Sequence, residues 1–126
     1  MSNYENPSAS RKGIKKLKEL AGPFHVLPDF IIIGAARSGT TALYDYMIKH
    51  PNIEKSTYKE IHYFNREYFR GLNWYKLFFP SKVKKFYNTK FLKKKFVTGE
   101  ASVLYMHHPH APRRTFELLP KVKIIV

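Results

Sequence analysis

The fold follows from one stretch of the chain, residues 30–41, which reads FIIIGAARSGTT. Its first four residues are apolar without alternation, which predicts a strand buried on both faces, as in a parallel sheet covered on two sides. Two glycines five positions apart follow, and residues 40–49 then show helical periodicity until Pro51 ends the helix. The expected apolar face of that helix consists of Ala42, Leu43, Tyr46 and Met47. This order of strand, glycine loop and helix is the starting point for the rest of the chain.

A glycine loop between a buried strand and a helix is typical of a phosphate-binding site. Backbone N–H groups can point inward there, and the helix N-terminus adds a partial positive charge worth about 0.3–1 kcal/mol per favourable contact. Arg37 adds a planar cation suited to phosphate or sulfate oxygens, and Ser38 and Thr41 add hydroxyl donors. Thr40 occupies the lysine position of the ATPase pattern, which disfavours nucleotide hydrolysis. The alternative is an ordinary glycine-containing turn.

Composition bounds the remaining possibilities. The 126 residues include 23 Lys and Arg against 9 Asp and Glu, a formal net charge of +14, and 44% are apolar. One domain with a modest core fits this length. The absence of cysteine excludes disulfides and thiolate zinc sites, and no apolar run reaches the ~20 residues needed to span a bilayer. The charge indicates an anionic partner, and the absence of a signal-peptide pattern favours a cytoplasmic location.

The other periodic segments complete an α/β pattern. Further strands are expected at residues 52–54, 96–100 and 122–126. Helices are expected at 72–79, which is rich in aromatic residues, and at 109–119, with Phe116, Leu118 and Leu119 available to the core. We therefore expect a parallel sheet with helices on both faces. Because the last strand would normally lead into another loop and helix, we expect the sheet to be truncated at its C-terminal side and the chain to be a fragment.

Residues 28–43 resemble the 5′-phosphosulfate-binding loop of sulfotransferases that use 3′-phosphoadenosine 5′-phosphosulfate (PAPS). Three later segments, residues 59–65, 71–80 and 99–105, resemble segments of heparan-sulfate-type sulfotransferases in the same order. The resemblance implies that residues 28–126 are the N-terminal portion of a sulfotransferase domain with a P-loop-like fold, preceded by a basic extension, residues 1–27. It also implies sulfuryl transfer from PAPS to a hydroxyl, or less readily an amine, of a carbohydrate-like acceptor.

The same resemblance assigns the site residues. Arg37 matches the cation that contacts the 5′-phosphate and the transferring sulfate. The residues expected to hold that phosphate are Arg37, Ser38, Gly39, Thr40 and Thr41. Glu60 matches the general base, with a surface carboxylate as the alternative reading. His62 is the alternative base, because another branch of the family uses histidine, and Lys59 could keep Glu60 ionised by its opposite charge.

Some features lie outside this pattern. The relatives often have lysine after the third segment's glutamate, but Ala101 follows Glu100 here, and the family's 3′-phosphate motif would come after residue 126. The seven lysines of residues 82–95 fit either a solvated surface or a contact with an acidic polymer. A basic nucleic-acid- or polyanion-binding module without catalysis is therefore the alternative function, although no nucleic-acid recognition signature is present and no nucleic-acid partner is expected. We expect no metal, because no carboxylate or thiol completes a ligand set around the three histidines of residues 106–110.

Overall fold

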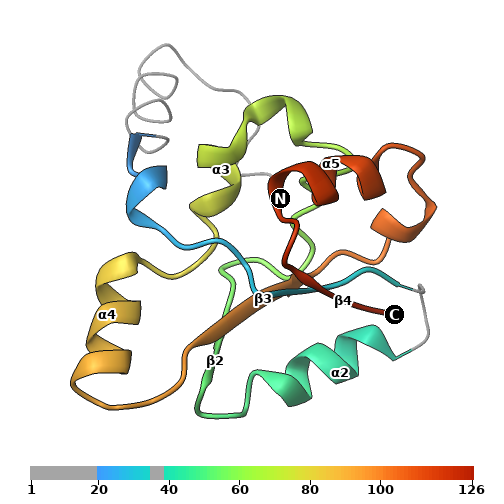
Figure 1. The fold of residues 1–126 in the computed structure, drawn as a ribbon. Coiled ribbons are helices and arrows are strands. Elements are labelled where there is room, and N and C mark those ends of the chain that lie inside the picture. The colour runs from blue at the N-terminus through green and yellow to red at the C-terminus, as the bar shows by residue number, and fades with distance from the viewer. Residues whose placement is uncertain (1–19, 35–38) are drawn as a thin grey trace, which may run out of the picture.

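The computed structural model describes residues 20–34 and 39–126, so Arg37, Ser38 and most of the basic extension lie outside the described residues. Four strands form one sheet. They are β1 (Phe30–Ile32), β2 (Ile53–Lys55), β3 (Val97–Ala101) and β4 (Lys123–Ile125). All pairings are parallel, in the order β2-β3-β1-β4, so β1 lies between β3 and β4 (Figure 1). The expected parallel sheet is confirmed.

Helices cover both faces of this sheet. The α-helices are α2 (Thr40–Met47), α3 (Leu72–Lys76), α4 (Lys82–Lys90) and α5 (Ala111–Leu118), and the short 3-10 helices are η2 (Gly22–Phe24), η3 (Tyr68–Arg70) and η4 (Tyr105–His107). Phe30 and Ile32 face α2, where they pack with Tyr44. Ile31 faces the other way, into a core that includes residues of α3 and α5. Figure 1 shows α2 on one side of the sheet and α3 and α5 on the other. Alternate residues of β1 therefore serve two cores, as its uniformly apolar sequence predicts.

The larger core is built from aromatic rings. Tyr63 stacks on Tyr75, with ring centroids 4.4 Å apart and planes inclined by 13°. Trp74, Phe78 and the neighbouring Phe79 are also buried, which confirms that residues 72–79 cover the core. The α-helix itself ends at Lys76, because the next amides donate to carbonyls three residues back and tighten the chain into turns.

The two predicted helix faces are only partly right. Met47 of α2 and Leu118 and Leu119 at the end of α5 pack against the cores as expected, whereas Tyr46 and Phe116 do not. In α2 the buried residues are Thr40 and Tyr44, whereas Tyr46 is 76% exposed, because the Tyr44 hydroxyl hydrogen-bonds inside the protein and fixes the rotation of the helix. In α5 Ala111 is buried, and Leu118, two turns further on, packs against the same core. Phe116 lies about 140° around the helix from Ala111 and is 71% exposed.

The contact between β1 and β3 leaves no room for a side chain at Gly99. A Cβ atom at this position would lie 2.5 Å from the carbonyl oxygen of Phe30 and 2.6 Å from its ring. We expect Gly99→Ala to lower the free energy of unfolding by about 2 kcal/mol or more, because the clash is partly with backbone. Urea unfolding followed by circular dichroism measures the change. A loss below about 0.5 kcal/mol would contradict the close pairing of these two strands.

Candidate active site

Three segments of the chain converge at the carboxyl edge of the sheet. β1 and β3 end side by side there, and the amide of Ser102, just after β3, donates to the carbonyl of Ile32 at 3.0 Å. The segment that follows β2 joins them, because the amide of Ala101 donates to the carbonyl of Lys59 at 3.3 Å. This edge is where open parallel sheets bind their ligands. The segment after β2, which carries Glu60, therefore lies at the same edge as the end of β1 and the end of β3.

The first part of the site is the N-terminus of α2. Gly39 precedes the helix with φ of 86°, a left-handed conformation that glycine adopts without strain. Among the described residues no side chain caps this end of the helix, and its first turn contains no acidic residue. Its first backbone N–H groups therefore remain available to an anion. Thr40 is buried, so Thr41 is the exposed hydroxyl of the pair.

Tyr44 fixes this helix against the rest of the site. Its buried hydroxyl donates to the carbonyl of Gly99 at 3.1 Å and accepts from the amide of Ser56 at 3.0 Å. The first bond reaches β3 and the second reaches the segment that leads to Glu60. A surface ion pair between Lys59 Nζ and Asp45 Oδ1, 2.9 Å apart, connects the same two parts. The start of α2 and the Glu60 segment are therefore held in a defined relation.

Glu60 supplies a partly exposed carboxylate on this edge. Its side chain is 35% exposed, and Oε2 lies 3.1 Å from Nε2 of His62. Burial raises the pKa of Glu60, although a backbone hydrogen bond from Val103 and the positive charges of Lys59 and Arg66 act in the opposite direction. The predicted effect of Lys59, whose opposite charge favours the ionised carboxylate, is present. Burial outweighs this effect.

His62 acts as a neutral donor in this arrangement. Burial, followed by the positive charge of Arg66, lowers the pKa of His62, so the ring is uncharged at neutral pH. Because an ionised carboxylate only accepts, the 3.1 Å contact with Glu60 Oε2 places the ring proton on Nε2. Nδ1 then faces the Asn65 amide at 3.5 Å. His62 has φ of 56°, and its carbonyl accepts from the amides of Arg66 and Glu67, both at 3.0 Å. The side chain and the backbone of His62 therefore both have hydrogen-bond partners, with Glu60 at Nε2 and Asn65 at Nδ1.

A second carboxylate, Glu100, lies beneath this loop and is fully buried. Oε1 accepts from the Ser102 hydroxyl at 2.6 Å, and Oε2 accepts from the hydroxyls of Tyr105, at 3.1 Å, and Tyr75. Burial raises the pKa of Glu100 to about 7, although the three hydroxyls favour the ionised form. Residues 99–105 resemble a segment that follows the third match in heparan-sulfate-type sulfotransferases, and such a resemblance would allow a loop that faces the substrate. Glu100, Ser102 and Tyr105 instead point into the protein, and the spacing of a serine and a tyrosine two and five residues after a glutamate is the only sequence signal of that network.

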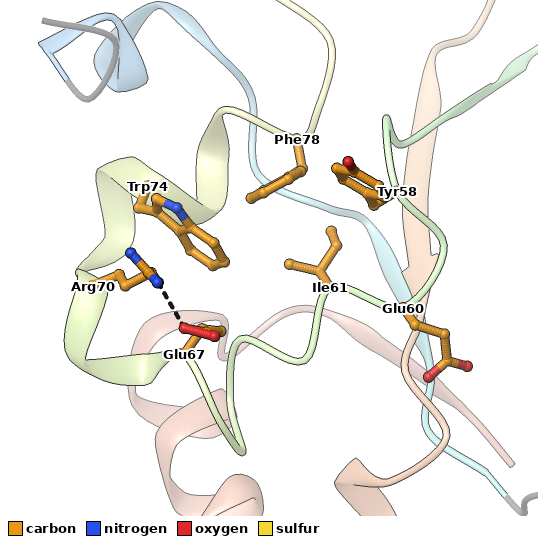
Figure 2. A pocket seen from close by; sticks show the side chains of 7 residues that line it. All are labelled: Tyr58, Glu60, Ile61, Glu67, Arg70, Trp74 and Phe78. Carbon is orange, nitrogen blue, oxygen red and sulfur yellow. Dashed lines mark hydrogen bonds and ion pairs between the residues drawn. The ribbon is translucent and has the colours of Figure 1, made fainter. Parts of the chain in front are cut away.

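A small pocket opens beside Glu60. It is lined by Tyr58, Glu60, Ile61, Glu67, Arg70, Trp74 and Phe78, and its volume is about 40 Å³ (Figure 2). Figure 2 shows the Glu60 carboxylate pointing away from the aromatic centre of this pocket, while Arg70 Nε donates to Glu67 Oε2 at 2.6 Å. The space suits one or a few water molecules and is far too small for a nucleotide. This pocket is therefore not a candidate nucleotide site.

Within residues 20–34 and 39–126, no three His, Cys, Asp or Glu side chains are grouped so that they could hold a metal ion. None of the helices described there has the length and apolar character that crossing a bilayer requires.

Comparisons with known proteins agree with this geometry. Residues 27–126 match the family model described as sulfotransferase domain. The human bifunctional heparan sulfate N-deacetylase/N-sulfotransferase 3 is 42% identical over 105 residues, covering 79% of this chain and 11% of the relative. The membrane-associated sulfotransferase kil1 of Dictyostelium discoideum is 38% identical, covering 83% and 21%. A sulfotransferase crystal structure from Alicyclobacillus acidocaldarius superposes with a TM-score of 0.55 at 30% identity, covering 79% of this chain and 43% of that one.

The buried carboxylate of Glu100 makes stability depend on pH. Because its pKa is raised from 4.5 to about 7, the folded state binds more protons than the unfolded state between these values. Stability should therefore fall as pH rises from about 4.5 to 7, by up to about 3 kcal/mol from this group. Glu100→Gln should remove that component, which urea unfolding at several pH values measures. Identical pH dependence in both proteins would contradict the assignment.

Proposed function

The chain belongs to the sulfotransferase domain family, and from that membership we propose that its protein transfers a sulfuryl group from PAPS to an amine or hydroxyl of a carbohydrate acceptor. In this proposal residues 28–126 form the N-terminal portion of the catalytic domain. The chain spans only about a tenth to a fifth of the curated relatives described above. Its contribution is therefore argued from its own site.

One observation carries the proposal. Glu60 presents a partly exposed carboxylate, hydrogen-bonded to neutral His62, at the same sheet edge as the N-terminus of α2, which no side chain of the described residues caps. Sulfuryl transfer needs these two elements, namely an anion site for the departing phosphate and a base for the attacking acceptor. A simple anion-binding module has no need for the second.

The chain's own residues fit the donor. PAPS supplies the sulfuryl group and leaves as a bisphosphate. The backbone N–H groups at Thr40 and Thr41, with the Thr41 hydroxyl, would hold its 5′-phosphate at the positive end of the helix dipole. Gly39 keeps the approach to these groups open, since nothing lies within 4 Å of the position its Cβ would take. Arg37 and Ser38, assigned from the sequence, would complete this phosphate site.

Glu60 would accept the proton of the acceptor as it attacks. His62 and the backbone of Val103 donate to this carboxylate, and because each carboxylate oxygen has two lone pairs, a further site remains for the incoming proton. The raised pKa of Glu60 makes the carboxylate a stronger base than an exposed glutamate. His62 itself would orient Glu60 rather than act as the base, because its Nε2 already carries the proton that it donates.

The acceptor class follows from the relatives and the charge. The human relative is named as a heparan sulfate N-sulfotransferase, which supports an amino group on a polysaccharide over the hydroxyl favoured by the sequence reading. A net charge of +14 suits an acidic polysaccharide. Full-length protein containing this segment should transfer label from [35S]PAPS to N-deacetylated heparosan, with N-acetylated heparosan as the control. Labelling of neither polysaccharide would overturn the acceptor class.

Glu60→Gln tests the base. The amide keeps the size of the side chain but cannot accept the proton, so we expect kcat to fall about 10²–10⁴-fold in the full-length protein. The KM for PAPS should stay within about threefold. Glu54→Gln is the matched control, since Glu54 pairs with Lys84 on the surface of β2 and should retain activity. Activity of Glu60→Gln within a few-fold of the unaltered enzyme would sink the assignment.

Arg37→Ala tests the phosphate site. Loss of the cation expected to contact the departing phosphate should reduce kcat/KM for PAPS about 10²–10³-fold. Arg37→Lys keeps the charge and should recover most of that loss. Unchanged kinetic constants in Arg37→Ala would remove Arg37 from the site.

A further inference from the structure

We propose that Glu100 is a positioning residue, whose buried carboxylate holds the Glu60 segment in place through the hydroxyls of Ser102 and Tyr105. The catalytic part of this inference rests on the proposed function, in which Glu60 is the base. Its geometric part stands on the hydrogen bonds alone. Glu100 itself has no exposed surface and would contact neither donor nor acceptor.

The first connection runs through Ser102. Its hydroxyl donates to Glu100 Oε1 at 2.6 Å and accepts from the backbone amide of His62 at 3.1 Å. His62 is the residue that orients the Glu60 carboxylate. One hydroxyl therefore links the buried carboxylate to the backbone of that residue.

The second connection runs through Tyr105. Its hydroxyl donates to Glu100 Oε2 at 3.1 Å and accepts from the backbone amide of Tyr63 at 2.7 Å. Consecutive amides, those of His62 and Tyr63, are thus fixed by two hydroxyls that meet at one carboxyl group. Because His62 also adopts a left-handed conformation, these bonds hold a turn that its sequence would not favour alone.

A carboxylate is the group that orients both hydroxyls. Each hydroxyl has one proton, and an ionised carboxylate can only accept it. Once both protons point at Glu100, the oxygen lone pairs are left for the amides of His62 and Tyr63. A neutral amide in its place would offer donors as well as an acceptor, and one hydroxyl would turn round. The direction of the whole network therefore depends on Glu100.

Tyr75 provides a matched control inside the same network. Its hydroxyl also donates to Glu100 Oε2, but the structure gives that hydroxyl no bond to the backbone of residues 60–64. Both Tyr75 and Tyr105 are buried, and both rings pack edge-on against Phe64, at centroid distances of 5.3 and 5.6 Å. Replacing either by phenylalanine removes one hydroxyl from Glu100 and keeps the ring, but only Tyr105→Phe releases the Glu60 segment.

The kinetic test compares these two variants in the full-length protein with N-deacetylated heparosan as acceptor. Tyr105→Phe should lower kcat at least tenfold while the KM for PAPS stays within twofold, because the phosphate site on α2 is untouched. Tyr75→Phe should keep kcat within threefold. Equal losses in the two variants would overturn the proposal, as would a Tyr105→Phe effect confined to KM.

Amide hydrogen exchange tests the geometry without any substrate. Exchange at the Tyr63 amide should speed up at least tenfold in Tyr105→Phe, and at the His62 amide in Ser102→Ala, whereas neither amide should change in Tyr75→Phe. Unchanged exchange in the first two variants would refute the positioning role. If the unaltered protein transfers no sulfate but shows this exchange pattern, the proposed function fails and the positioning of the segment stands.

Discussion

The arrangement of this molecule depends on the cost of burying the Glu100 carboxylate. An ionisable group with no exposure is tolerated only when its oxygens are hydrogen-bonded. Here three hydroxyls meet that need, and they come from α3, from the end of β3 and from η4. Two of those hydroxyls also accept hydrogen bonds from backbone amides of the segment after β2. The hydrogen bonds around this one buried carboxylate thus connect four parts of the chain at the edge of the sheet where Glu60 lies.

The two faces of the sheet make separate contributions to that edge. On one face, Tyr44 holds α2 against β3, and so places the start of the helix where an anion can reach its N–H groups. On the other face, stacked aromatic rings around Tyr63 support the Glu60 segment. Since β1 and β3 lie between the two, the start of α2 and the Glu60 segment are fixed to the same pair of strands. Rigid placement of this kind is what a transfer reaction needs, because reacting groups must be held within a fraction of an ångström.

Sequence reasoning reached the sheet, the glycine loop and the candidate base because each leaves a local pattern. Uninterrupted apolar residues marked β1, and the resemblance around residue 60 pointed to Glu60. The exposure of Tyr46 on α2 and of Phe116 on α5 left no such pattern. Tyr46 and Phe116 are as apolar as the residues that are buried. The rotation of α2 is set by the hydroxyl of Tyr44, which forms hydrogen bonds with residues 12 and 55 positions away in the sequence. The burial of the Glu100 side chain could not be predicted either, because a glutamate on its own is expected at the surface and its hydrogen-bond partners are known only from the fold.

A crystal structure of the full-length protein with 3′-phosphoadenosine 5′-phosphate and a glucosamine-containing oligosaccharide tests the central claim most directly. The account predicts the 5′-phosphate on the backbone N–H groups of Thr40 and Thr41, with an oxygen of Glu60 within about 3 Å of the acceptor nitrogen or hydroxyl. A 5′-phosphate bound away from the start of α2, or an acceptor whose reacting atom faces another side chain while Glu60 points elsewhere, would contradict it.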